Sequence, residues 1–118
     1  MLLRVDATSS QPIFEQLAGC VRAEIARGGL GVGDSLPGAR DVGEQLGVNH
    51  HTVLKAYQQL RDEGLVELRP GRGAVVTASA ATLGGLHVAV ASLVAKAREA
   101  GLPDETLVSL VRVAQREK

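Results

Sequence analysis

Residues 33–76 constrain the fold of this 118-residue chain most, because they carry helix, turn and hairpin signals in one order. Apolar residues recur at helical spacing over 39–46 and again over 50–62. Two β-prone runs follow at 65–68 and 74–77, joined by a Pro-Gly-Arg-Gly tetrapeptide that is typical of a hairpin tip. This order predicts a winged helix-turn-helix.

Local signals predict where the helices begin and end. A first helix is expected at Pro12, which suits an initial helical turn, with a capping cluster at 8–10 ahead of it. Gly38 is expected to cap the second helix and Asn49 the third. Gly47 can adopt the left-handed backbone conformation that a sharp turn between those two helices needs.

From residue 79 the sequence changes to two apolar helical stripes, which Gly101 separates. A hairpin of two helices cannot bury both apolar faces alone, so we expect a second copy of the chain to cover it. The predicted domains are a winged helix-turn-helix at 1–78 and a helical dimerisation segment at 79–118, which makes the fold class mainly α with a small β-hairpin. The residues expected at the dimer interface are Leu83, Leu86, Val90, Leu93, Val94, Leu107, Leu110 and Val111.

Composition favours a cytoplasmic protein without a metal or cofactor. The single cysteine, Cys20, excludes an intrachain disulfide and disfavours a cysteine-based zinc site. The N-terminus lacks the basic and apolar segments of a signal peptide. The longest weakly polar run, 83–95, is too short to span a bilayer and contains His87, which we expect in a core or an interface. We therefore expect no membrane partner.

Net charge does not favour a nucleic-acid interface. The chain has 13 Lys or Arg and 13 Asp or Glu, and residues 1–78 have 8 and 9 of them, respectively. Any affinity for phosphate must therefore come from a few well-placed cations and from helix N-termini.

Short motifs between residues 12 and 76 occur in a specific joint order. They are Glu15-Gln16-Leu17, Gly33-Asp34, Leu36-Pro37, Arg40, Leu46-Gly47-Val48-Asn49, Thr52-Val53, Lys55-Ala56-Tyr57, Leu60, Gly64-Leu65-Val66, Gly71-Arg72-Gly73 and Val76. In this order the chain resembles the GntR family of bacterial transcription regulators, and within it the small YtrA-type branch. The resemblance implies a winged helix with a short C-terminal dimerisation part that binds palindromic operators as a dimer.

The chain departs from the family at several positions. Gly38 stands where the family usually has Ser, and His50 and His51 occupy a region where many relatives carry Arg. Leu54 replaces another common Arg. We expect these changes to alter the DNA sequence that is read and not the way the helix docks.

The third helix and the hairpin tip carry most of the expected DNA contacts. The N-terminus of the third helix favours an approaching phosphate, and Gln58 can contact adenine. Each position has a simpler reading, such as a capping role for Asn49 or a solvated surface for Arg72. The predicted DNA-binding residues are Arg40, Asn49, His50, His51, Thr52, Lys55, Gln58, Arg72 and Gly73.

These patterns predict a sequence-specific, homodimeric DNA-binding regulator, most simply a repressor on a palindromic operator. A winged helix that binds another protein instead of DNA is the alternative. No nucleophile–base pair, phosphate loop or metal cluster occurs in the sequence, so we expect no enzyme activity. The sequence leaves open whether a small-molecule effector exists.

Overall fold

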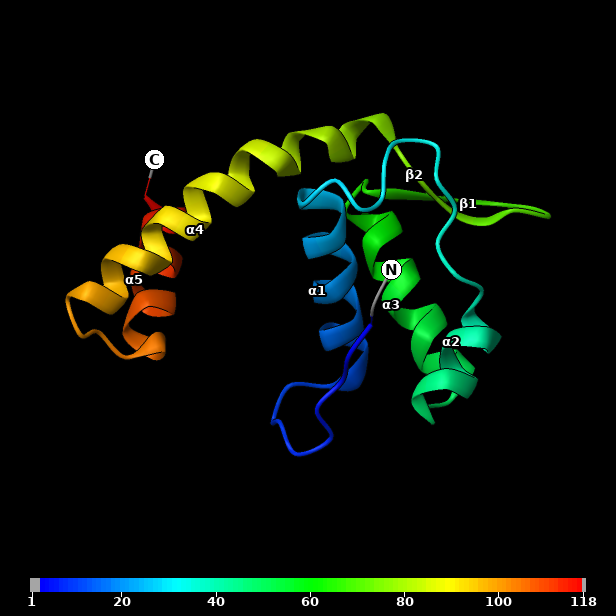
Figure 1. Ribbon diagram of the computed structural model, residues 1–118, viewed down its shortest axis with the longest axis horizontal. Helices are drawn as coiled ribbons and strands as arrows, with labels where there is room; N and C mark the ends of the chain where they lie inside the picture. The colour runs from blue at the N-terminus through cyan, green and yellow to red at the C-terminus, as the bar shows by residue number, and fades with distance from the viewer. Residues whose placement is uncertain (1–2, 118) are drawn as a thin grey trace. The chain divides into compact units, whose positions relative to one another are not determined.

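The structure is a computed structural model that describes residues 3–117, and contacts divide the chain into two units (Figure 1). The first unit ends at Gly85 and the second begins at Leu86. In chain order, the elements of the first unit are α1 (Ile13–Ala26), α2 (Ala39–Leu46), α3 (His50–Asp62), β1 (Val66–Arg69), β2 (Gly73–Val76) and the 3-10 helix η1 (Ala78–Thr82). Helix α4 (Leu83–Glu99) begins in the first unit, and the second unit holds the rest of α4 together with α5 (Asp104–Arg116).

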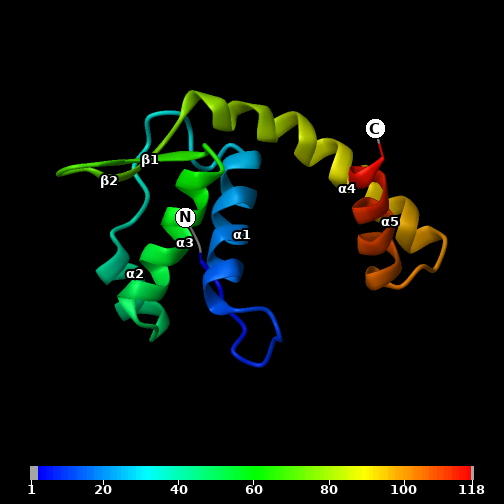
Figure 2. The ribbon, with the colours of Figure 1, turned by 180° about the vertical axis from the view of Figure 1, so that it is seen from behind.

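Helix α3 lies at the centre of the first unit and contacts both α1 and α2 (Figure 2). Leu17 and Val21 of α1 and Val53 and Leu60 of α3 are at most 1% exposed. The stripe predicted on the third helix is the one that is buried, and the mainly α fold with a β-hairpin is confirmed. Small aliphatic side chains build most of this core because the chain has only one Phe and one Tyr.

The two strands of the wing pair antiparallel, with Val66 opposite Val76. Strand β1 begins one residue later than predicted and β2 one residue earlier. Leu65 is not part of β1 because its N–H donates to the Leu60 carbonyl as part of the cap of α3, in which Gly64 has a φ of +82°. The segment before α2 pairs with the other side of β2 through a bridge between Ser35 and Val75.

The start of α1 differs from the prediction. Pro12 occupies the N-cap position and no side chain caps the helix. Thr8, part of the expected capping cluster, instead donates through its N–H and its hydroxyl to the Asp6 carboxylate. Proline separates the cluster from the helix, so the cluster closes its own turn before the chain reaches α1.

The boundary between the units falls seven residues after the predicted position at 78/79. The methyl group of Ala80 is buried in the core of the first unit, and Leu83 packs against the same core. The first turn of α4 therefore belongs to the winged helix.

The second unit is a helical hairpin with little apolar burial of its own. Gly101 separates the two helices, as the sequence predicted, and has a φ of +72°; α5 begins after Pro103. Among the described residues of this unit, Ala97 alone is buried. Val94 and Leu107 are half-buried. The large apolar residues that remain exposed in this unit are Leu86, Val88, Val90, Leu93, Leu102, Val108, Leu110, Val111 and Val113.

The helical run from η1 into α4, Ala78–Glu99, is 22 residues long and has a mean hydropathy of 1.6. By length and composition alone it is sufficient to cross a membrane, so the expectation that the chain has no apolar run of that length is wrong. The discrepancy arises because η1 continues directly into α4, which lengthens the helical run beyond the 83–95 segment seen in the sequence.

Candidate nucleic-acid interface

The turn between α2 and α3 depends on two glycines. Gly47 has a φ of +69°, which is the left-handed conformation predicted for it. A Cβ atom on Gly43 would lie 2.8 Å from the Val48 carbonyl oxygen, so only glycine lets the turn pack this closely on α2. The Val48 N–H donates to the Gly43 carbonyl at 3.0 Å and closes the turn. These contacts fix the direction in which α3 leaves the turn.

Asn49 caps α3, as predicted. Its side-chain oxygen accepts a hydrogen bond from the His51 N–H at 2.8 Å, and its carbonyl accepts one from the Thr52 N–H at 3.0 Å. Asn49 is exposed, so the positive end of the helix dipole is accessible to an anion.

The outward face of α3 carries three side chains at positions i, i+3 and i+7. They are His51, Leu54 and Gln58, all of which are exposed, and Leu54 is 38% exposed. Residues at this spacing share one side of a helix, so the three form a continuous stripe along the exposed face of α3.

Two histidines begin α3 with their rings close together. The ring centroids of His50 and His51 are 4.2 Å apart and the planes are tilted by 34°. The pKa of His50 lies below its usual value, first because desolvation penalises its charged form and then because His51 and Arg40 are nearby. Arg40 and Glu44 of α2 line the same shallow hollow as the two histidines. His50 is therefore neutral near pH 7 in the free protein.

Lys55 turns toward α1. Its ammonium nitrogen lies 4.0 Å from the centroid of the Phe14 ring, which is a cation–π contact. Lys55 is nevertheless exposed. The contact holds the ammonium group at the edge of α3 that adjoins α1, away from the stripe formed by His51, Leu54 and Gln58.

Arg72 at the wing tip folds back on the segment before α2. Its guanidinium donates to the Gly33 carbonyl oxygen at 3.0 Å and to the Ser35 hydroxyl at 3.3 Å. Arg72 is still exposed, so these two bonds orient the guanidinium without removing it from solvent. Gly73, predicted with it, has a φ of +77° and stands opposite Arg69 at the end of the hairpin.

A groove separates α3 from the wing, with Leu54 on one side and Leu68 on the other. The charged residues that line it, in the described part of the chain, are Arg69 and Arg72. At its floor the Tyr57 hydroxyl donates to the Pro37 carbonyl at 2.6 Å, and burial raises the pKa of Tyr57 to about 12. The groove is thus apolar inside and cationic at its wing side.

The structure brings six of the nine predicted residues into two places. Arg40, Asn49, His50 and His51 line the hollow at the α2–α3 turn, and Arg72 and Gly73 line the groove. Gln58 lies further along the exposed face, whereas Lys55 turns toward α1 and Thr52 is half-buried. The sequence did not predict a role for Leu68, which lines the groove, or for Ser35, which contacts Arg72. Both positions depend on strand pairing, which local sequence does not reveal.

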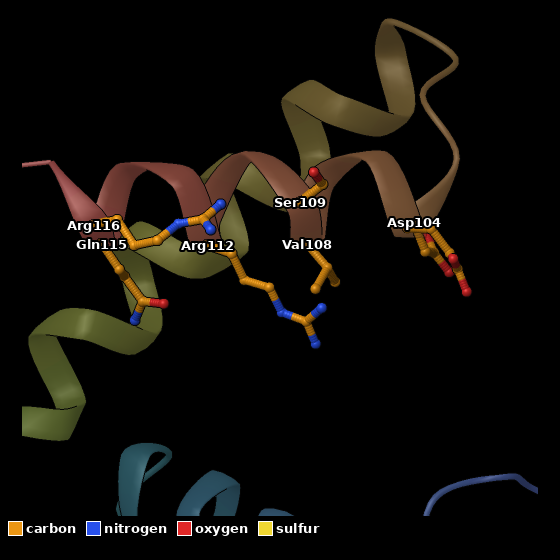
Figure 3. A pocket seen from close by; sticks show the side chains of 7 residues that line it. Asp104, Val108, Ser109, Arg112, Gln115 and Arg116 are labelled. Carbon is orange, nitrogen blue, oxygen red and sulfur yellow. The ribbon is translucent and has the colours of Figure 1, made fainter.

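Helix α5 carries a further hollow that is lined by its own side chains alone (Figure 3). Asp104 and Glu105 lie at its N-terminal end, and Arg112 and Arg116 lie toward its C-terminus. This arrangement matches the helix dipole and stabilises the helix. Side chains of a single helix cannot enclose a ligand, so the hollow is not a binding site by itself.

A capped recognition helix, a tight turn and a cationic hairpin define a winged helix-turn-helix, which is a class of DNA-binding domain. The chain belongs to the GntR family of bacterial regulatory proteins, which residues 14–76 match. It is a DNA-binding transcription regulator and not an enzyme, as the sequence predicted.

Individual relatives agree with the predicted YtrA-type branch. The HTH-type transcriptional repressor YtrA of Bacillus subtilis is 35% identical over 81 residues, which are 69% of this chain and 62% of YtrA. The structure of YtrA from Sulfolobus acidocaldarius, a GntR-family transcription factor, is 36% identical with a TM-score of 0.63 and covers 80% of this chain and 99% of its own. The DNA-binding domain of AraR in complex with operator ORX1 is 26% identical with a TM-score of 0.57 and covers 64% of this chain and 93% of its own.

Proposed function

We propose that the chain is a homodimeric, cytoplasmic repressor that binds a palindromic operator. The observation that carries this proposal is the exposed stripe of His51, Leu54 and Gln58 beside the groove that bears Arg69 and Arg72. A helix with such a face fits a major groove while the wing lies along the adjacent backbone or minor groove.

The residues divide by role. Arg40, the capped N-terminus of α3 at Asn49 and Arg72 contact phosphates and set the register on the duplex. His51 and Gln58 read base edges, with Thr52 assisting at the helix start, where His50 contacts a phosphate. Further phosphate contacts come from Lys55 at the α1 edge and from the backbone at Gly73.

Dimerisation explains the exposed apolar surface of the second unit. Leu86, Val90 and Leu110 are 58%, 55% and 56% exposed in the single chain. A soluble monomer rarely exposes a large apolar patch, and a two-fold partner would cover these side chains. The proposed interface keeps the predicted residues except Leu83, which packs against the core of its own chain.

The proposal favours a protein partner over a membrane for α4. The start of the long helical run is taken up by the winged helix, because Ala80 is buried there. Residues 86–99 would span only about 21 Å at a rise of 1.5 Å per residue, which is less than the roughly 30 Å of a bilayer core.

The relatives support the finer parts of the proposal. YtrA of Bacillus subtilis is named a repressor, and the AraR domain was solved with an operator. Repression follows most simply if a bound dimer blocks the promoter sterically. Two recognition helices about one helical turn apart on the DNA would give the operator two-fold symmetry.

A mobility-shift titration tests the proposal, together with a measurement of the mass of the protein–DNA complex, which gives the number of chains on each duplex. The probe is the duplex that the protein enriches most from a random pool. We expect two chains on each duplex and an affinity that falls steeply with salt. One chain per duplex would contradict the dimer, whereas the absence of any discrete site at low salt would favour a protein-binding winged helix.

A further inference from the structure

We propose that Leu54 makes the protein read thymine, through contact of its side chain with a thymine C5-methyl group in the major groove. This inference rests on the proposed function, since it requires α3 to enter that groove. It adds to the proposed function the thymine methyl group as a feature that the protein recognises, and Leu54 as the residue that recognises it.

The exposure of Leu54 is unusual for its helix. The other large aliphatic residues of α3, Val53 and Leu60, are fully buried, whereas Leu54 is 38% exposed. It lies in the exposed stripe between His51 and Gln58, one helical turn after the Asn49 cap. The N-terminal turns of a recognition helix are those that reach base edges.

The chemistry of the major groove determines what can cover this leucine. Base edges there present hydrogen-bond donors and acceptors, and their one apolar group is the thymine methyl. A leucine side chain has no hydrogen bond to offer, so it gains by burying a methyl group and loses if it desolvates a polar edge. Leu54 therefore discriminates in favour of thymine at the position it faces.

The surroundings of Leu54 point to DNA and not to another protein as its cover. It lines the groove whose charged residues, in the described part of the chain, are Arg69 and Arg72. A polyanion that follows the groove would pass these arginines while α3 faces the bases. Leu68 lies across the groove on β1 and is also 38% exposed, which makes it a matched comparison.

The test compares thymine and uracil, which differ by the methyl group alone. The probe is the duplex sequence that the wild-type protein enriches from a random pool, synthesised once with thymine and once with uracil. We expect the uracil duplex to bind about 4-fold more weakly for each methyl contact, or about 16-fold for a two-fold site with one contact in each half. Leu54→Ala should bind both duplexes with equal affinity, and Leu54→Met should retain the preference.

Leu68→Ala is the control for groove shape. It should weaken binding to both duplexes alike and keep the wild-type ratio between them. A wild-type ratio near one, or a full ratio in Leu54→Ala, would overturn the inference while leaving DNA binding intact. Loss of the ratio in Leu68→Ala would also overturn it, because the effect would then belong to the groove and not to Leu54. A wild-type protein that enriched no duplex would overturn the proposed function itself.

Discussion

The Arg72 guanidinium donates a hydrogen bond to the Gly33 carbonyl oxygen across 3.0 Å, which ties the tip of the wing to the segment before α2. The same nitrogen also reaches the Ser35 hydroxyl. A guanidinium has five N–H donors, so these bonds leave others for a phosphate. The wing arginine is therefore oriented before DNA arrives, and less side-chain entropy is lost on binding.

Replacement of Arg72 by Ala should weaken DNA binding by about 10-fold on every sequence. The slope of log affinity against log salt should also become shallower by about 0.9 for each protomer, since one phosphate contact is lost. Titrations at several salt concentrations measure both effects. Arg27→Ala is the matched control, because Arg27 pairs with Glu24 at the end of α1 and should leave affinity and slope unchanged. An unchanged salt slope in the Arg72 variant would contradict the phosphate contact.

His51 and Gln58 should determine which bases are preferred. Both are exposed on the stripe of α3, so Ala at either position removes a hydrogen-bonding group without disturbing the core. Selection from a random pool of duplexes should give the His51→Ala and Gln58→Ala variants a relaxed consensus at one position in each half-site. If both variants select the wild-type consensus, the stripe does not read bases.

Acidification should strengthen DNA binding. The pKa of His50 is lowered in the free protein by desolvation and by the nearby His51 and Arg40, so His50 is neutral at pH 7.5. A phosphate stabilises the charged form and raises that pKa, so binding takes up a proton and affinity rises as the pH falls. Titrations at pH 7.5 and 6.0 should differ several-fold, and His50→Gln should reduce the difference. Equal affinities at the two pH values would exclude a contact of His50 with phosphate.

Gly43→Ala should lower the free energy of unfolding by about 1–3 kcal/mol. The new Cβ would lie 2.8 Å from the Val48 carbonyl oxygen and 3.3 Å from the His50 nitrogen, so the turn before α3 must shift. Denaturant titration measures the loss. Gly19→Ala offers a control in α1, where a Cβ meets nothing within 4 Å, and should be stabilising by about 0.5–1 kcal/mol. Equal stability of the two variants would show that the α2–α3 turn tolerates displacement.

Charge on the apolar face of α4 should separate the protomers. Leu86→Glu combined with Val90→Glu places two carboxylates on a surface that is more than half exposed in the single chain. Sedimentation should show a monomer, and operator affinity should fall with it because the two recognition helices no longer bind together. Val32→Glu alters a residue of the first unit that is 58% exposed, and it should remain dimeric. A dimer that persists in the α4 variant would place the interface elsewhere.

Much of the first unit could be predicted because its signals are local. Gly47 must be left-handed, Asn49 can cap only the helix that begins directly after it, and the helical stripe that includes Tyr57 fixes which face of α3 is buried. The prediction failed where distant segments decide. The cluster at 8–10 closes on Asp6 and does not cap α1, and no local pattern indicates this choice.

The contacts of the candidate site show the same division. Sequence placed His51 on the exposed face of α3, since helical periodicity determines it. It did not reveal that Lys55 turns toward Phe14 or that Arg72 reaches Ser35, because these partners lie about 40 residues apart along the chain. Contacts between side chains of different elements depend on tertiary packing, which a periodic sequence pattern does not reveal.

Hydroxyl-radical footprinting of the wild-type protein on the DNA upstream of its own gene tests the central claim most directly. The account predicts two protected half-sites, related by two-fold symmetry and separated by about one helical turn, with the protection lost in the Arg72→Ala variant at moderate salt. A single unsymmetrical footprint, or no protection even at low salt, would contradict it.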